Sequence, residues 1–116
     1  MSYKLIAIDL DDTLLNNANV IPDRAGRAIR AAAAQGVYVV LCTGRIKKGM
    51  QRYYDELGLD TLMITAGGAE VYDASGRLVF SRGVDPALAR QVIEFGDRLG
   101  VHSQVYIGGE LVYRKK

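Results

Sequence analysis

The chain has 116 residues, of which 49% are hydrophobic and 24% charged, a composition typical of a folded globular protein and not of a disordered one. The formal net charge of +2 is small and dispersed, so we do not expect a nucleic acid partner. Cys42 is the single cysteine and no long apolar run is present, so we expect no internal disulfide, no membrane partner and a cytoplasmic location.

The first predicted strand, residues 4–8, leads directly into a group of acids. Its apolar run is typical of a buried parallel strand, and Asp9 and Asp11 follow it. Open α/β sheets bind their ligands beyond the carboxyl ends of their strands. Side chains two residues apart in extended backbone share a face, so we expect both carboxylates to point into one space. This arrangement predicts a bound Mg²⁺, or one carboxyl group that stays protonated as an acid.

A helix over residues 22–35 and a strand over residues 37–42 come next. Gly36 lies where the helix needs a left-handed end. The continuous apolar run of residues 37–42 is typical of a strand that is buried on both faces. A right-handed crossover of this length brings the residues after the second strand to the edge where the first group of acids lies.

Polar residues suited to binding phosphate follow the second strand. Thr43 offers a hydroxyl group, and Gly44 lets the backbone amides of the turn approach a phosphate closely. Arg45 is able to clamp a phosphate through two parallel hydrogen bonds, although a loop arginine can also simply lie in solvent. The sequence therefore predicts that Thr43 and Asp9 share one site.

The remaining elements repeat the alternation of strand and helix and then change character. We predict a helix over residues 47–57, a strand over residues 61–65, a hairpin from residues 70–73 and 78–81, a helix that begins at Asp85-Pro86 and ends near Gly100, and a last hairpin from residues 104–107 and 110–113. The sole histidine, His102, is expected to have a surface or packing role. The fold class that these elements predict is α/β with a parallel sheet.

The run Asp9-Leu10-Asp11-Asp12-Thr13 resembles the first signature, DxDxT, of the haloacid dehalogenase (HAD) superfamily of phosphohydrolases, and other positions resemble its Cof-type branch. The resemblance implies a partial, Rossmann-like three-layer core over residues 1–84, with three parallel strands and a hairpin. It also implies the beginning of an α+β cap domain over residues 85–116. Cof-type proteins usually carry Asn-Gly where this chain has Gly67-Gly68, a departure that bears on substrate fit.

The resemblance also implies a mechanism. Asp9 would attack phosphorus and become an aspartyl-phosphate, while Asp11 would act as general acid and then as general base. Mg²⁺ would lie between Asp9, Asp11 and the phosphate. Thr13 would steady Asp11 and its loop. The residues implied in binding substrate or phosphate are Thr13, Thr43, Gly44 and Arg45.

The family pattern continues beyond the residues present, with a lysine motif and two further aspartates. We therefore expect slow or no turnover by this chain alone, and a first strand that forms an exposed apolar edge through which copies self-associate. The implied substrate is a small phosphorylated metabolite such as a sugar phosphate. Two alternatives stay open, namely a non-catalytic fragment that binds phosphate or metal or self-assembles, and a sugar phosphomutase.

Overall fold

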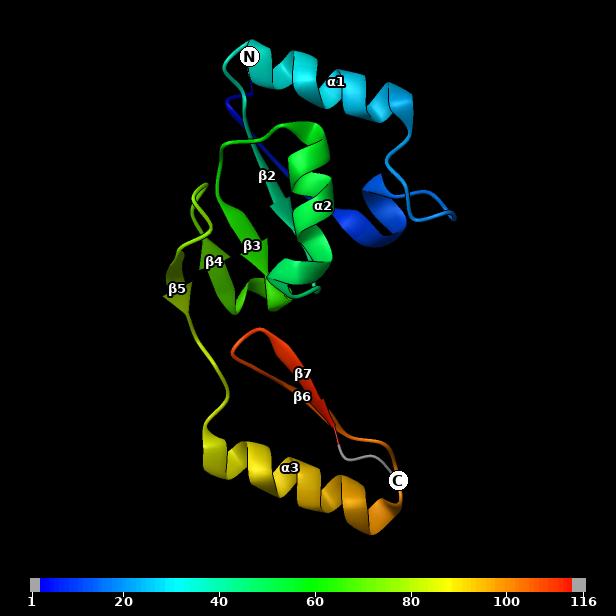
Figure 1. Cartoon of the computed structure of the whole chain (residues 1–116), viewed down its shortest axis with the longest axis vertical. Coiled ribbons are helices and arrows are strands. Elements are labelled where there is room, and N and C mark those ends of the chain that lie inside the picture. The colour runs from blue at the N-terminus through cyan, green and yellow to red at the C-terminus, as the bar shows by residue number, and fades with distance from the viewer. Residues whose placement is uncertain (1–2, 114–116) are drawn as a thin grey trace. The chain divides into compact units, whose positions relative to one another are not determined.

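The computed structural model describes residues 3–113, which fall into two compact units that divide between Ser81 and Arg82 (Figure 1). The expected boundary, after residue 84, lies three residues later. The assignment of residues 1–84 to a core and of residues 85–116 to a cap stays a prediction. Across the described residues, no helix is long and apolar enough to cross a membrane.

The first unit is built on a five-stranded sheet in the order β1-β2-β3-β4-β5. The strands are β1 (Leu5–Asp9), β2 (Tyr38–Cys42), β3 (Met63–Thr65), β4 (Glu70–Tyr72) and β5 (Leu78–Ser81). β1, β2 and β3 run parallel, whereas β4 and β5 form an antiparallel hairpin beside β3. These are the three parallel strands and the hairpin that the sequence predicts.

Two helices, α1 (Asp23–Ala34) and α2 (Lys47–Leu57), connect the parallel strands. Ile29 of α1 and Met50 of α2 belong to one buried cluster with Leu41 of β2, so both helices cover the same face of the sheet. Burial of these apolar stripes is the main source of stability for such short helices. The fold class is confirmed as a partial Rossmann-like α/β core; of the three layers expected, the described residues of the first unit, 3–81, supply the sheet and one helical layer.

β1 lies at the edge of the sheet and has β2 as its neighbour. Leu5 and Ile6 are 56% and 37% exposed. The prediction that this strand is buried is therefore wrong, whereas the prediction that it forms an exposed apolar edge is confirmed. β2 lies between two strands, and its central residues, Val39 and Leu41, are 1% and 0% exposed. The difference in burial therefore follows from position in the sheet, because both strands have similarly apolar sequences.

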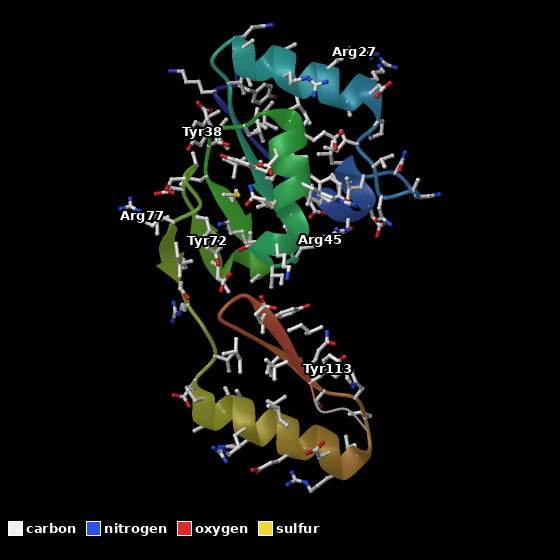
Figure 2. All side chains as sticks on the ribbon, in the orientation of Figure 1. Arg27, Tyr38, Arg45, Tyr72, Arg77 and Tyr113 are labelled. Carbon is white, nitrogen blue, oxygen red and sulfur yellow. The ribbon has the colours of Figure 1, made fainter. Side chains whose placement is uncertain are left out.

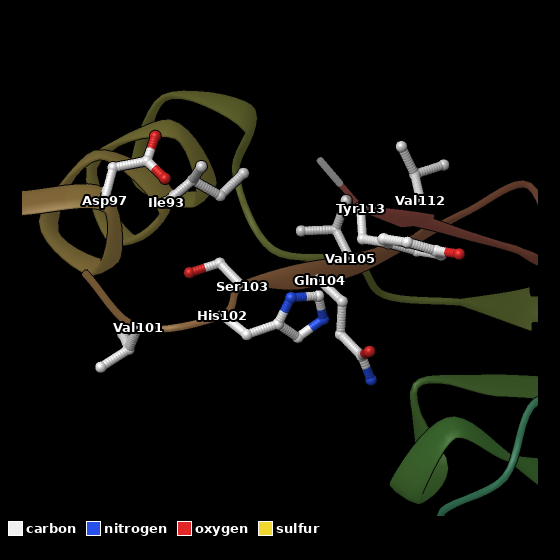
Figure 3. Close-up of a pocket in the computed structure, with 9 residues that line it drawn as sticks. All are labelled: Ile93, Asp97, Val101, His102, Ser103, Gln104, Val105, Val112 and Tyr113. Atoms are coloured by element: carbon white, nitrogen blue, oxygen red, sulfur yellow. The ribbon is translucent and has the colours of Figure 1, made fainter. Parts of the chain in front are cut away.

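The second unit consists of α3 (Pro86–Leu99) and the hairpin of β6 (Gln104–Ile107) and β7 (Glu110–Tyr113). The Asp85 carboxylate caps α3 by accepting hydrogen bonds from the amides of Ala87 and Leu88. His102 packs edge-on against Tyr113, with ring centroids 5.8 Å apart, which agrees with a packing role. A hollow of about 320 Å³ within this unit is lined by residues of α3, β6 and β7 and by the segment before β6 (Figure 3).

Candidate functional site

The candidate site lies at the carboxyl ends of the parallel strands in the first unit. β1 ends at Asp9, which pairs in register with Cys42, so Thr43 follows immediately on the neighbouring strand. A hollow of about 360 Å³ opens there. Its lining residues are Asp9, Cys42, Thr43, Gly44, Ile64, Gly67 and Gly68. The structure therefore brings Asp9, Thr43 and Gly44 together, as the crossover argument predicts.

Backbone hydrogen bonds fix the two loops that follow β2 and β3. The amide of Gly67 donates to the carbonyl of Thr43 at 3.0 Å, and the amide of Ala66 donates to the carbonyl of Arg45 at 2.8 Å. The Thr43 hydroxyl oxygen accepts a hydrogen bond from the amide of Arg45 at 3.1 Å. Because a hydroxyl has one proton to donate as well as oxygen lone pairs, this contact does not use the O–H proton of Thr43.

After Asp9 the chain makes one wide turn over residues 10–14, which the amide of Leu15 closes by donating to the carbonyl of Leu10 at 2.9 Å; Asp11 and Asp12 are not helical within it. Leu10 is fully buried and anchors this turn, while Asp12 has a positive φ of 58°, a conformation that aspartate tolerates better than most residues. Asp11 itself is extended, but the turn that contains it interrupts the regular strand in which Asp9 and Asp11 would share a face. Within the described residues, Asp11 does not line the hollow beside Asp9.

Arg45 holds the carboxylate of Asp11 through a two-pronged ion pair. Its Nε donates to Oδ2 at 2.8 Å and its Nη2 donates to Oδ1 at 2.5 Å. The guanidinium group of Arg45 holds the pKa of Asp11 below its ordinary value, and the carboxylate in turn raises the pKa of Arg45. Arg45 lies in the loop just before α2 (Figure 2), where it clamps a carboxylate of the protein, whereas the sequence predicts a clamp on phosphate.

Thr13 contacts Asp9, whereas the sequence predicts a contact with Asp11. The Thr13 hydroxyl donates to Asp9 Oδ2 at 3.2 Å, since the wide turn carries residue 13 back toward the end of β1. Among residues 3–113, no other group donates a hydrogen bond to the Asp9 carboxylate. The hydrogen bond to Oδ2 therefore orients the carboxylate of Asp9, and Oδ1 remains available to a ligand.

Cys42 is a part of the site that sequence reasoning missed. Partial burial, together with the neighbouring charge of Asp9, raises the pKa of its thiol, so the neutral form is favoured. The register between β1 and β2 places it directly opposite Asp9. The signal available in the sequence was its position one residue before Thr43, since the last residue of a strand often shares the edge with the loop that follows.

The acids of this site suit a magnesium ion that is shared with a ligand. Within the described part of the chain, no group of three or more His, Cys, Asp or Glu side chains is arranged to hold a metal. Mg²⁺ is commonly bound by one or two carboxylates and completed by water and substrate phosphate. The Asp9 carboxylate fits that role, whereas the Asp11 side chain is already paired with Arg45.

Comparison with known proteins agrees with this geometry. Residues 6–116 match the family model of haloacid dehalogenase-like hydrolases. Over 79 residues the chain is 46% identical to the 5-amino-6-(5-phospho-D-ribitylamino)uracil phosphatase YcsE of Bacillus subtilis, a match that covers 68% of this chain and 32% of YcsE. Over 108 residues it is 33% identical to phosphatase YwpJ of B. subtilis, covering 93% of this chain and 38% of YwpJ.

A solved haloacid dehalogenase-like hydrolase from B. subtilis has a similar fold. The two structures superpose with a TM-score of 0.87 at 32% sequence identity, and the match covers 97% of this chain and 40% of the solved one. The chain thus spans between about a third and two fifths of the length of these relatives. Because the family model covers nearly the whole chain and the motifs at the strand ends agree with it, the chain belongs to the haloacid dehalogenase-like hydrolases.

Proposed function

We propose that this chain carries the nucleophile, Asp9, of a Mg²⁺-dependent phosphatase. The phosphatase would hydrolyse a small phosphate monoester through an aspartyl-phosphate on Asp9. The observation that supports it most directly is the hollow that Asp9 and Thr43 both line, which brings a carboxylate with one available oxygen and a hydroxyl group to the same place. Named phosphatases among the relatives support the reaction class. We further propose a cytoplasmic location, on the sequence argument alone.

Asp9 is suited to nucleophilic attack because its orientation is set in advance. The Thr13 hydroxyl holds Oδ2, which leaves Oδ1 to form a bond with phosphorus as the alcohol departs. The Thr43 hydroxyl and the amides around Gly44 would hold the phosphoryl oxygens in place. When bound, Mg²⁺ would neutralise charge on the phosphoryl group and on Asp9.

Asp11 is the proposed proton carrier, and its ion pair with Arg45 fixes which state it starts from. The pair lowers the pKa of Asp11 and therefore favours the carboxylate form, which suits a base that takes a proton from water in the second step. Protonating the leaving alcohol in the first step needs the acid form. Loosening of the contact between Arg45 and Asp11 would return the pKa of Asp11 only toward its ordinary value. The acid form would also need the negative charge of the bound phosphate nearby, which raises the pKa of a carboxyl group, and a proton taken up from solvent.

The proposed substrate is a small phosphorylated metabolite, with a sugar phosphate as one example. YcsE is named for a substrate that carries a phosphorylated ribityl chain, which fits this class. The two alternatives differ in outcome. A sugar phosphomutase would return phosphate to a second hydroxyl of the sugar, and a non-catalytic fragment would bind phosphate or metal, or self-assemble, without releasing alcohol.

Turnover of 4-nitrophenyl phosphate, with and without Mg²⁺, tests the proposal. We expect slow release of nitrophenol that requires Mg²⁺ and is lost in Asp9→Asn, because the amide cannot form the acyl-phosphate. Intact-mass analysis of the quenched reaction should show one added phosphoryl group in the parent and none in the variant. Equal release by the parent and Asp9→Asn would remove Asp9 as the nucleophile.

A further inference from the structure

Part of the wall of the hollow beside Asp9 is bare backbone. Three of its seven lining residues are glycines, namely Gly44, Gly67 and Gly68. A Cβ atom placed on any of the three would meet no atom within 4 Å outside the adjacent residues of the chain. These positions therefore leave open space where other residue types would place side chains.

Gly67 is the position at which a side chain would change the hollow most predictably. Its amide donates to the carbonyl of Thr43 at 3.0 Å, so its backbone is fixed relative to the phosphate-binding loop. Its φ of 65° lies in the left-handed region, which glycine and asparagine accept more readily than other residues. A side chain here would thus project from a fixed point beside Thr43.

We infer that position 67 determines which phosphate monoesters the site accepts, and that glycine there admits leaving groups that contain a bulky ring. This inference rests on the proposed phosphatase function and deepens it. A polar side chain in a wall discriminates strongly against groups that cannot pair with it, by up to about 10⁵-fold, whereas a wall of glycine backbone imposes no such test. The neighbouring side chains of Cys42 and Ile64 offer a ring apolar surface.

The test is calorimetric titration of the whole chain in Mg²⁺ with three ligands that are not hydrolysed: inorganic phosphate, methylphosphonate and 1-naphthylmethylphosphonate. The variant is Gly67→Asn, because asparagine tolerates the positive φ. The matched control is Gly58→Asn. Gly58 has the same φ of 65° and equally open space around a built Cβ atom, but it ends α2 and does not line the hollow.

We expect the parent to bind the naphthyl ligand at least as tightly as methylphosphonate. Gly67→Asn should lower the affinity for the naphthyl ligand by about tenfold or more, which is the scale of a steric mismatch in a binding pocket. It should change the affinity for inorganic phosphate by less than about twofold. Gly58→Asn should change neither affinity. Melting curves check folding, and Gly67→Ala, which should show the same selective loss to a smaller degree, serves if Gly67→Asn does not fold.

Equal effects of Gly67→Asn on the small and the bulky ligand, or no effect on either, would overturn the inference and leave the phosphate site standing. A parent chain that binds no inorganic phosphate would overturn the proposed function itself, and the inference with it. The titration with inorganic phosphate therefore distinguishes a failure of this inference from a failure of the proposed function.

Discussion

At the scale of single residues, two hydrogen-bonding pairs organise the proposed chemistry. Thr13 orients Asp9 through one carboxylate oxygen, and Arg45 holds both oxygens of Asp11. The two acids therefore differ in environment although they are two positions apart. Asp9 keeps an available oxygen for attack, while Asp11 is held as a carboxylate by a cation.

Replacing Arg45 should raise the pKa of Asp11. The ion pair stabilises the charged carboxylate and lowers this pKa, so Arg45→Gln should move it back toward the ordinary value of about 3.9. Carbon-13 NMR titration of the aspartate carboxyl groups measures the shift directly. Arg52→Gln is the matched control, because Arg52 lies over the ring of Tyr53 and not beside Asp11. An unchanged pKa of Asp11 in Arg45→Gln would contradict the pairing.

The sequence predicted which residues lie at the same edge of the sheet, but it did not predict which side chains pair with one another there. Asp9 and Thr43 were predictable because strand ends and a crossover of ordinary length determine where they lie. The pair between Asp11 and Arg45 was not, because it depends on the wide turn that begins at Leu10 and redirects the chain. Hydrophobic periodicity carries no information on that turn or on side-chain rotamers.

At the scale of elements, turn chemistry fixes where strands begin and end. The hairpin of β6 and β7 has the predicted bounds, because Gly108 and Gly109, with φ of 59° and 81°, form the two-residue turn between them. β3 is shorter than predicted and begins at Met63. The Thr61 hydroxyl donates to the carbonyl of Val39, so the segment before β3 contacts β2 through a side chain and not through the strand ladder.

The turn between β4 and β5 should depend on the charge of Asp73. Its carboxylate accepts hydrogen bonds from the Ser75 hydroxyl and from the amide and side chain of Arg77, which together lower the pKa of Asp73 to about 2. A carboxyl group whose pKa is depressed by folding contributes stability above its unfolded pKa, and that contribution is lost as pH falls through the folded value. The contribution of Asp73 should therefore be present at pH 6 and mostly lost near pH 2.

Comparing free energies of unfolding at pH 6 and pH 2 tests this expectation. Asp73→Ala should be less stable than the parent at pH 6, with the difference shrinking toward pH 2. Asp60→Ala removes an exposed acid from another loop and is the control. Its free energy of unfolding relative to the parent should change less between pH 6 and pH 2 than that of Asp73→Ala. A difference between the parent and Asp73→Ala that is the same at both pH values would show that the charge of Asp73 does not stabilise the turn.

Burial of β2 should make it the most sensitive strand of the sheet. Leu41 is fully buried against α1 and α2, so Leu41→Ala should lower the free energy of unfolding by about 2–5 kcal/mol. Leu5→Ala, at a site that is 56% exposed on β1, removes the same atoms and should cost well under half as much. Chemical unfolding of both variants measures the two values, and equal losses would contradict the assignment of β1 to the open edge.

At the scale of the whole molecule, β1 leaves one edge of the sheet in the first unit open to pairing with another strand. The amide of Tyr38 donates to the carbonyl of Lys4, so residues in phase with Lys4 face β2, while Leu5 and Ala7 direct their backbone groups to the open edge. An unpaired apolar edge strand is a template for another strand. We propose that copies of this chain associate through β1.

Sedimentation at increasing protein concentration tests this association. We expect the parent to form larger species, and Ala7→Lys to remain smaller at the same concentration, because a charge on an edge strand opposes pairing. Ala31→Lys places the same charge on an exposed position of α1 and should behave as the parent does. Identical behaviour of the parent and Ala7→Lys would rule out β1 as the contact.

The central claim is that one edge of the sheet binds a phosphoryl group between Asp9 and Thr43. Backbone amide NMR, recorded while phosphate is added in the presence of Mg²⁺, tests it most directly. We predict that the largest chemical-shift changes fall on residues 9–13, 43–45 and 66–68, and that Asp9→Asn greatly reduces them. Changes centred elsewhere in the chain, or no changes at saturating phosphate, would contradict the claim.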